Sequence, residues 1–221
     1  MQQEPVHHFL IKGVDNMPHL LCLGDSITDC GRIFDFPPLG CGYVQQIEHR
    51  LRNCGKNWMI SNCGTDGFTT ARLLSNTPLF YLPKNADITT ILIGINDVGV
   101  IMNTCESSDG RMHLLEQSLK NYHQILTLFF NKKQRLVLME PFLFSRPQEY
   151  LNWLPWREKM SLGMQSLADS YGFPYLLLQK YFEEKAEQYG TDALTTDGIH
   201  LTAFGHELLS DRLFPLLRTM Y

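Results

Sequence analysis

The sequence repeats one pattern along most of its length: a short apolar run followed by a longer amphipathic segment. The apolar runs are four to eight residues long and rich in aliphatic or β-branched side chains, at residues 19–23, 58–61, 88–95, 135–139 and 174–178. Such runs are typical of buried parallel strands. Helical spacing of apolar residues marks the segments between them, at 43–53, 70–81, 111–131 and 156–171, and a last helix is predicted to start with Thr202 as its N-cap. The alternation predicts an α/β fold: a single-domain three-layer α/β/α sandwich around a five-stranded parallel sheet, of the flavodoxin-like type.

Composition narrows the class of protein. A chain of 221 residues suits one domain, and its formal net charge of −4 offers no basic field for DNA or RNA, so no nucleic-acid partner is expected. The sequence has no apolar run of about 18 residues and no signal-peptide pattern, so no membrane association is expected. Six cysteines without a CxxC pair argue against a disulfide scaffold or a zinc ribbon. A reduced, soluble, cytoplasmic protein is the expected class.

Ligands of such sheets bind outside the carboxyl ends of the strands, so the residues after each apolar run are the functional candidates. GDSIT follows the first run and places Ser26 at a helix N-terminus, where free amides and the helix dipole stabilise an oxyanion; a plain N-cap serine is the alternative. A loop with Gly64 and Gly67 follows the second run, and its backbone could approach a ligand or form an ordinary turn. GIND follows the third, and its Asn96 could donate to an oxyanion or serve as a turn residue.

A carboxylate and an imidazole stand three residues apart near the C-terminus, in DGIH. On a helical turn this spacing lets Asp197 accept a hydrogen bond from Nδ1 of His200, which leaves Nε2 free to face a nucleophile. The alternatives are a surface Asp–His pair or half of a metal site with His206. Because no third or fourth ligand stands at a suitable spacing, no metal is expected.

Together, GDSIT, the Gly67 loop, GIND and DGIH resemble the four sequence blocks of the SGNH (GDSL) hydrolase superfamily. The resemblance implies that Ser26 is the nucleophile, His200 its base and Asp197 the partner of that base. It also implies an oxyanion hole made of the Ser26 and Gly67 amides and the Asn96 side chain, and no cofactor. It extends from about residue 20 to the final helix, which assigns residues 18–221 to the SGNH hydrolase domain and leaves 1–17 as an N-terminal extension.

A finer resemblance concerns the substrate. The stretches DSITDCGR, LGCGYV and IGINDV are similar to the intracellular acetylxylan-esterase branch of the superfamily, whose members remove acetyl groups from xylo-oligosaccharides. This implies a serine ester hydrolase that cleaves small acyl esters, such as O-acetyl groups on carbohydrate. A lysophospholipase or thioesterase acting on longer acyl chains is an alternative, and a flavodoxin-like binding module without enzymatic activity is another. Members of that branch form oligomers, so a homo-oligomer is left open.

Several other residues have structural roles that compete with, or replace, a role in function. The aromatic insert 141–156 contains Trp153 and Trp156, which could contact a sugar substrate, pack beneath a long loop or lie in a subunit contact. Asp25 and Asp97 are expected to hold their loops through local hydrogen bonds. The cysteines near the motifs are expected to be small hydrophobic fillers rather than catalytic thiols; they are Cys30, Cys41 and Cys63.

Overall fold

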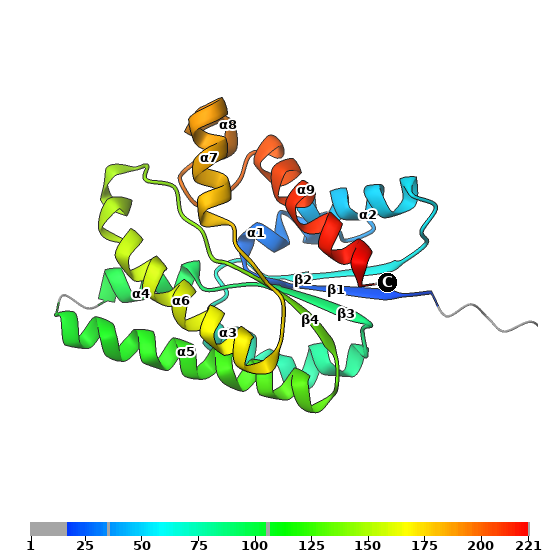
Figure 1. The fold of residues 1–221 in the computed structure, drawn as a ribbon, viewed down its shortest axis with the longest axis horizontal. Coiled ribbons are helices and arrows are strands. Elements are labelled where there is room, and N and C mark those ends of the chain that lie inside the picture. Colours follow the sequence, from blue (N-terminus) through cyan, green and yellow to red (C-terminus); the bar gives the residue numbers. More distant parts are fainter. Residues whose placement is uncertain (1–16, 35, 105–106, 221) are drawn as a thin grey trace, which may run out of the picture.

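The computed structural model describes residues 17–34, 36–104 and 107–220, so the predicted extension 1–17 lies, apart from Met17, outside the described residues. Five strands form one sheet in the order β2-β1-β3-β4-β5, and all neighbours are parallel (Figure 1). This order is the flavodoxin-like arrangement, and it confirms the predicted fold class. The strands are β1 (His19–Gly24), β2 (Met59–Gly64), β3 (Ile88–Leu92), β4 (Arg135–Met139) and β5 (Tyr175–Leu176).

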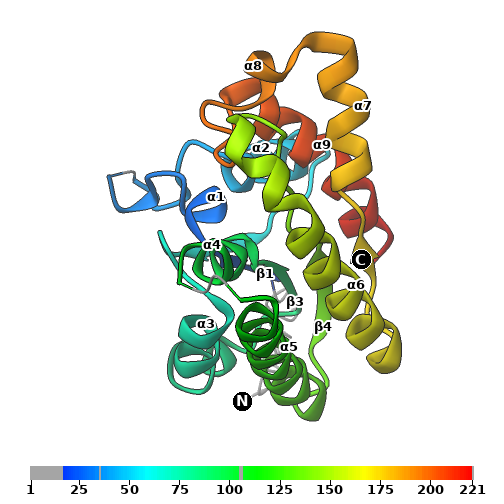
Figure 2. The ribbon, with the colours of Figure 1, turned by 90° about the vertical axis from the view of Figure 1, so that its left-hand side faces the viewer.

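Helices cover both faces of the sheet (Figures 1 and 2). One face carries α2 (Tyr43–Asn53) and α9 (Ala203–Thr219), which pack against each other, and the short α1 (Ser26–Asp29) lies on the same side. Above the carboxyl ends of the strands, α7 (Gln179–Tyr189) and α8 (Thr191–Leu194) extend this layer. The opposite face carries α3 (Thr70–Asn76), α4 (Ile95–Thr104), α5 (Ser108–Asn131) and α6 (Leu154–Tyr171).

The central strands are buried over their full length, as their apolar composition predicts. Every residue of β1 and of β3 is buried, because each strand has a neighbour on both sides and helices above and below. Three helices start at side-chain caps: Thr69, Ser107 and Thr202 each accept a hydrogen bond from a backbone amide in the first turn of α3, α5 and α9. The predicted cap at Thr202 is thereby confirmed.

Of the boundaries that differ from the sequence prediction, two have a clear backbone reason. The third strand ends at Leu92 instead of residue 95, because Gly94 has φ +123° and turns the chain into α4. The helix predicted over 70–81 ends as an α-helix at Asn76 and continues as a wider turn, Thr77–Tyr81. Pro78 lies in that turn, and its ring nitrogen has no hydrogen to donate to the preceding turn.

Candidate active site

The candidate site lies where β1 ends, between its neighbours β2 and β3. Gly24 is the last residue of β1 and pairs with Gly64 on one side and Leu92 on the other. A side chain at Gly24 would overlap the Thr28 hydroxyl and the Leu92 carbonyl, so the chain can turn into α1 here only with glycine. This turn places Ser26 as the first residue of α1, at the carboxyl edge of the sheet that Figure 2 faces.

Ser26, His200 and Asp197 form a continuous chain of hydrogen bonds. The Ser26 Oγ lies 2.8 Å from His200 Nε2, and His200 Nδ1 lies 2.6 Å from Asp197 Oδ2. Because the carboxylate can only accept, Nδ1 carries the imidazole proton, and Nε2 of the neutral ring accepts from the serine hydroxyl. The fold therefore brings Ser26 into contact with His200, although the two residues are 174 positions apart in the sequence.

Asp197 is oriented by its own turn. Its Oδ1 accepts hydrogen bonds from the amides of Ile199 (2.9 Å) and His200 (2.8 Å), which leaves Oδ2 for the imidazole. Partial burial alone would raise the pKa of Asp197, but the hydrogen bonds from the His200 ring and from these two amides outweigh it and lower the pKa below its ordinary value. The group is therefore an ionised acceptor, suited to holding one tautomer of His200.

The second and third sequence blocks contact each other. Asn96 lies at the start of α4, and its Nδ2 donates to the Phe68 carbonyl over 2.9 Å, which ties it to the loop that contains Gly67. Gly67 is exposed and has φ +69°, a backbone conformation that favours glycine. Below them, Asp97 accepts from the amide (2.9 Å) and the hydroxyl (2.6 Å) of Thr70, so the two blocks are joined by buried hydrogen bonds.

Asp25 is a buried carboxyl directly before the serine. Its Oδ1 caps α1 by accepting from the Ile27 amide over 3.1 Å, while no hydrogen bond reaches Oδ2 from the described residues. Desolvation raises the pKa of Asp25 to about 7. Asp25 thus makes the local hydrogen bond expected of a residue that holds its loop, whereas Asp97 bonds to Thr70, 27 positions away, and holds two loops together.

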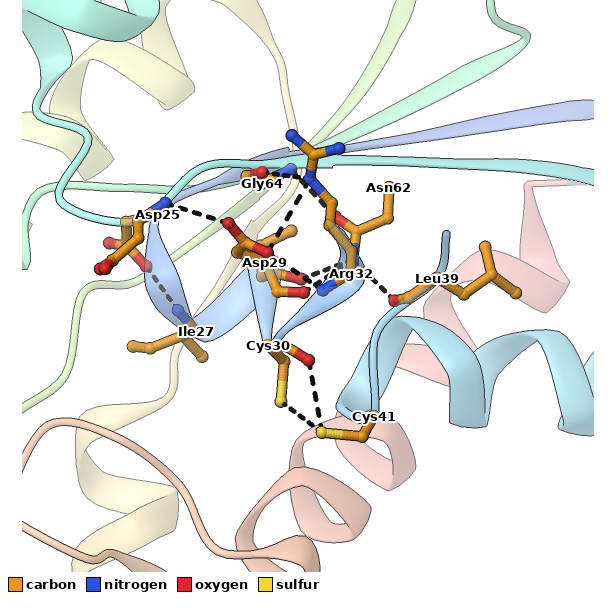
Figure 3. Close-up of polar contacts among 11 residues, drawn as sticks. Asp25, Ile27, Asp29, Cys30, Arg32, Leu39, Cys41, Asn62 and Gly64 are labelled. Atoms are coloured by element: carbon orange, nitrogen blue, oxygen red, sulfur yellow. Dashed lines mark hydrogen bonds and ion pairs between the residues drawn. The ribbon is translucent and has the colours of Figure 1, made fainter. Parts of the chain in front are cut away.

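A third supporting residue, Asn62, was not a sequence candidate. Its Nδ2 donates to the carbonyls of Thr28 and Leu39, both at 2.7 Å, and its Oδ1 accepts from the Gly64 amide at 2.9 Å. Figure 3 shows Asn62 between the end of α1 and the incoming segment at Leu39. An asparagine two residues before a strand-ending glycine was the only signal available, and its partners are far away in the sequence.

Arg32 and Asp29 add a second tie between α1 and β2 (Figure 3). Arg32 Nε donates to the Gly64 carbonyl over 2.5 Å, and its amide donates to Asp29 Oδ1 over 3.1 Å. Asp29 Oδ2 accepts from the amide of Asp66, next to Gly67. The serine helix and the Gly67 loop are therefore held as one unit.

The comparisons with known proteins now identify the family. The sequence matches the GDSL-like Lipase/Acylhydrolase family over residues 22–208. The chain belongs to this family. The acetylxylan esterase of Geobacillus stearothermophilus is 26% identical over 204 residues, which cover 86% of this chain and 90% of that protein. The isoamyl acetate-hydrolyzing esterase of Saccharomyces cerevisiae is 24% identical over 218 residues, covering 91% and 86%.

A solved structure has the same fold. The crystal structure of the acetylxylan esterase from Geobacillus stearothermophilus superposes with a TM-score of 0.78 at 24% identity, covering 92% of this chain and 94% of that chain. Family and relatives together make the protein a GDSL-type esterase/acylhydrolase, a carboxylic ester hydrolase.

This GDSL esterase has a small open cavity at the serine. The cavity has a volume of about 320 Å³, with Ser26 and His200 among its lining residues. Ile33 and Phe34 form an apolar wall and are 69% and 89% exposed, an unusual state for side chains of this size. The remaining lining residues are Asp29, Cys30, Gly31 and Asp66.

The two tryptophans proposed to contact substrate lie away from this cavity. Trp156 is buried in the core of the GDSL esterase, with the Lys159 ammonium 4.3 Å from the centre of its ring. Trp153 packs beside Gly99 and pairs with Tyr150 at a centroid distance of 4.7 Å. Neither lines the space next to Ser26, so these contacts favour packing against neighbouring helices over contact with substrate.

His206 is the third residue of the metal site that the sequence left as an alternative. It is buried, and its ring hydrogen bonds are with Tyr43 and Cys30 rather than with Asp197 or His200. Its Nδ1 accepts from the Tyr43 amide over 3.2 Å, and burial, with the nearby His200, lowers the pKa of His206 to about 4. Among the residues that the structure describes, no group of three or more His, Cys, Asp or Glu side chains is placed to hold a metal ion. Within the same residues, no helix is long and apolar enough to cross a membrane.

Proposed function

We propose that this esterase cleaves small acyl esters through a Ser26–His200–Asp197 triad and an acyl-enzyme intermediate. The observation that carries the proposal is the unbroken chain of hydrogen bonds from Ser26 Oγ to Asp197, at 2.8 and 2.6 Å. Both distances lie within the range required of a nucleophile, its base and the group that orients the base. The direction of these hydrogen bonds also suits the reaction, because the ionised carboxylate fixes the imidazole proton on Nδ1 and leaves Nε2 to accept the serine proton.

In the first half of the reaction, Ser26 Oγ attacks the ester carbonyl while its proton moves to His200 Nε2. The tetrahedral intermediate carries an oxyanion, for which we assign three donors: the amides of Ser26 and Gly67 and the Nδ2 of Asn96. Collapse of the intermediate breaks the bond to the alcohol, which leaves with the proton from His200. Asp197 stabilises the imidazolium that exists between these two proton transfers.

In the second half, water replaces the alcohol. His200 takes a proton from the water as its oxygen attacks the acyl carbon, and the same donors hold the second oxyanion. The intermediate releases a carboxylic acid, and the proton returns from His200 to Ser26 Oγ. The chemistry is balanced with ester and water as the only reactants, and the side chains supply both proton transfers.

For the substrate we propose acetyl and other short acyl esters, with O-acetyl groups on carbohydrate as the first class to test. Support comes from the two curated relatives, whose names specify acetylxylan and isoamyl acetate. The cavity volume of about 320 Å³ lies at the small end of the range for ligand sites, roughly 300–1,000 Å³. An acetyl group with part of its alcohol fits a site of this size better than a long acyl chain does.

Substitution of the nucleophile and base tests the mechanism. Ser26→Ala and His200→Ala are each expected to lower kcat on p-nitrophenyl acetate by roughly 10⁴–10⁶, and the double variant should be little worse, because the two residues act as a unit. Ser170→Ala on α6 and His49→Ala on α2 are matched controls, since both positions are exposed and outside the cavity. Turnover near the wild-type rate in Ser26→Ala would end the triad assignment.

A series of p-nitrophenyl esters tests the acyl group. We expect kcat/KM to fall beyond about four carbons, whereas an acyl tunnel would gain about 0.8 kcal/mol for each buried methylene. Acetylated xylo-oligosaccharide measured beside p-nitrophenyl acetate tests the carbohydrate class. A profile that climbs through eight to twelve carbons would favour the long-chain lysophospholipase or thioesterase alternative instead.

A further inference from the structure

Two thiols face each other near the serine cavity, and of the two only Cys30 lines it. The Sγ atoms of Cys30 and Cys41 are 3.4 Å apart. Figure 3 shows the two side chains pointing toward each other. The backbone holds them together, because the Cys41 amide donates to the Cys30 carbonyl over 3.0 Å and the Cys41 thiol donates to the same carbonyl over 3.3 Å. Cys41 is exposed, so the filler role expected from the sequence does not describe it.

Cys30 differs from Cys41 in its surroundings. It follows α1 directly, is half-buried, and lines the same cavity as Ser26 and His200. Desolvation and the neighbouring Cys41 raise the pKa of the Cys30 thiol to about 12. Its other polar neighbour is His206, whose Nε2 lies 3.4 Å from Cys30 Sγ.

The tautomer of His206 suits a reaction at Cys30. Because His206 Nδ1 accepts from the Tyr43 amide, the neutral ring carries its proton on Nε2, which points at the Cys30 sulfur. A donor in this position stabilises negative charge that develops on the sulfur when the thiol reacts. His206 has no role in the ester hydrolysis described above.

We propose that Cys30 and Cys41 are a redox-modifiable pair that forms an intramolecular disulfide with hydrogen peroxide, and that this bond slows ester hydrolysis at Ser26. The exposed thiol of Cys41 reacts first: it releases its proton, the thiolate attacks one peroxide oxygen, and the O–O bond breaks. The hydroxide that leaves takes up the released proton, so the products are a sulfenic acid and water. Cys30 then attacks the sulfenic sulfur, the S–O bond breaks, and the hydroxyl leaves as water with the Cys30 proton. Peroxide is the two-electron oxidant, and both sulfurs are oxidised.

The Cys30–Cys41 disulfide requires a small movement next to the helical turn that carries Ser26. The two sulfurs must approach from 3.4 Å to about 2.05 Å. The Cys30 amide donates to the Ser26 carbonyl over 2.9 Å, so a shift of Cys30 acts on the single turn that carries the nucleophile. The bond also joins both ends of the segment that bears Ile33 and Phe34, the apolar wall of the cavity. We therefore expect a fall of roughly tenfold in kcat/KM, since an error of about 1 Å at reacting groups can cost about 10²-fold.

Peptide mapping tests formation of the bond. Trypsin cleaves after Arg32 and so separates Cys30 from Cys41, and only a disulfide keeps the two peptides together. After treatment of the full chain with hydrogen peroxide, we expect an intact mass lower by two hydrogens and a linked peptide pair that fragmentation assigns to Cys30–Cys41. Cys41→Ser should abolish the linked pair. Cys54→Ser is the matched control, because Cys54 is an exposed thiol at the end of α2, and it should leave the pair unchanged. Peroxide treatment that only adds oxygen, or that links other cysteines, would overturn the proposal.

Activity measurements test whether the disulfide slows ester hydrolysis at Ser26, a claim that rests on the proposed function. Oxidised wild-type protein should hydrolyse p-nitrophenyl acetate roughly tenfold more slowly in kcat/KM, and dithiothreitol should restore the rate. Cys41→Ser should have the reduced wild-type activity before and after peroxide. A disulfide without a change in rate would refute the coupling, whereas no turnover in the reduced protein would count against the proposed function and leave the peptide result standing.

Discussion

Asp25 links the stability of this protein to pH in an unusual direction. Asp25 is 1% exposed; its Oδ1 accepts from the Ile27 amide, and no hydrogen bond from the described residues reaches its Oδ2. Desolvation therefore raises its pKa from 3.8 to about 7. Between these values the unfolded chain has released the proton and the folded protein still holds it, so the free energy of unfolding falls as pH rises. The contribution is complete below about pH 4 and is lost by about pH 8. At about 1.36 kcal/mol for each tenfold change in proton affinity, the loss is at most about 4 kcal/mol.

Asp25→Asn isolates this contribution. Asparagine keeps the acceptor for the Ile27 amide and, like the protonated acid, places a donor at the unpartnered position, but it cannot ionise. Urea unfolding of both proteins should therefore show the variant gaining on the wild type as pH rises from 4 to 8, by up to about 4 kcal/mol.

Asp197→Asn is the control for this measurement, because the contribution of Asp197 to stability changes with pH in the opposite direction. The pKa of Asp197 is lowered, so its ionised form stabilises the fold above the ordinary value and that stability is lost as pH falls. This variant should be destabilised at pH 8 and less so below about pH 4. If the difference between Asp25→Asn and wild type stayed constant with pH, or grew in favour of the wild type, the carboxyl would be ionised in the folded protein and the argument would be wrong.

Two further predictions follow from the contacts. Asn96→Ala should lower kcat by roughly 10²–10³ with a smaller change in KM, as expected when a donor to the oxyanion is removed; an increase confined to KM would make Asn96 a substrate-binding residue. Glu140→Ala should lower the free energy of unfolding by about 3–5 kcal/mol, because it leaves the buried Arg157 guanidinium without its carboxylate (2.7 Å). Urea denaturation measures that loss, and a change below about 1 kcal/mol would show that the pair is solvated.

The alternation of strands and helices was predictable because burial on two faces and helical periodicity leave direct traces in the sequence. The helix 43–53 and the strand 135–139 occur with the predicted bounds. By contrast, α4 escaped prediction because Ile95 continues an apolar run, and only the positive φ of Gly94 ends the strand. The helix α7 escaped because it is largely polar and buries little beyond Gln179 and Phe182.

The residues of the candidate site also divide into those that could be inferred from the sequence and those that could not. Ser26, His200 and Asp197 stand in short local motifs, so their identity could be inferred from residue type and spacing before their contact was visible. Asn62 could not be inferred, because its function depends on the parallel register that brings β2 beside β1 and on the carbonyls of two distant segments. The role of the tryptophans could not be inferred from the sequence for a related reason: an aromatic side chain is equally suited to a core and to a sugar, and only its position decides.

The structure separates the groups assigned to the chemistry from those that can select the ester. The supporting carboxylates Asp25 and Asp97 and the amide of Asn62 are all buried, so a change there disturbs α1 or the Gly67 loop and acts on every substrate alike. Ile33 and Phe34 are exposed, and they lie outside the hydrophobic core that the described residues form. Substitutions in this wall can therefore alter the fit of the acyl or alcohol group at little cost in stability. It follows that relatives at 24–26% identity can keep the hydrolytic site and still differ in the ester they accept.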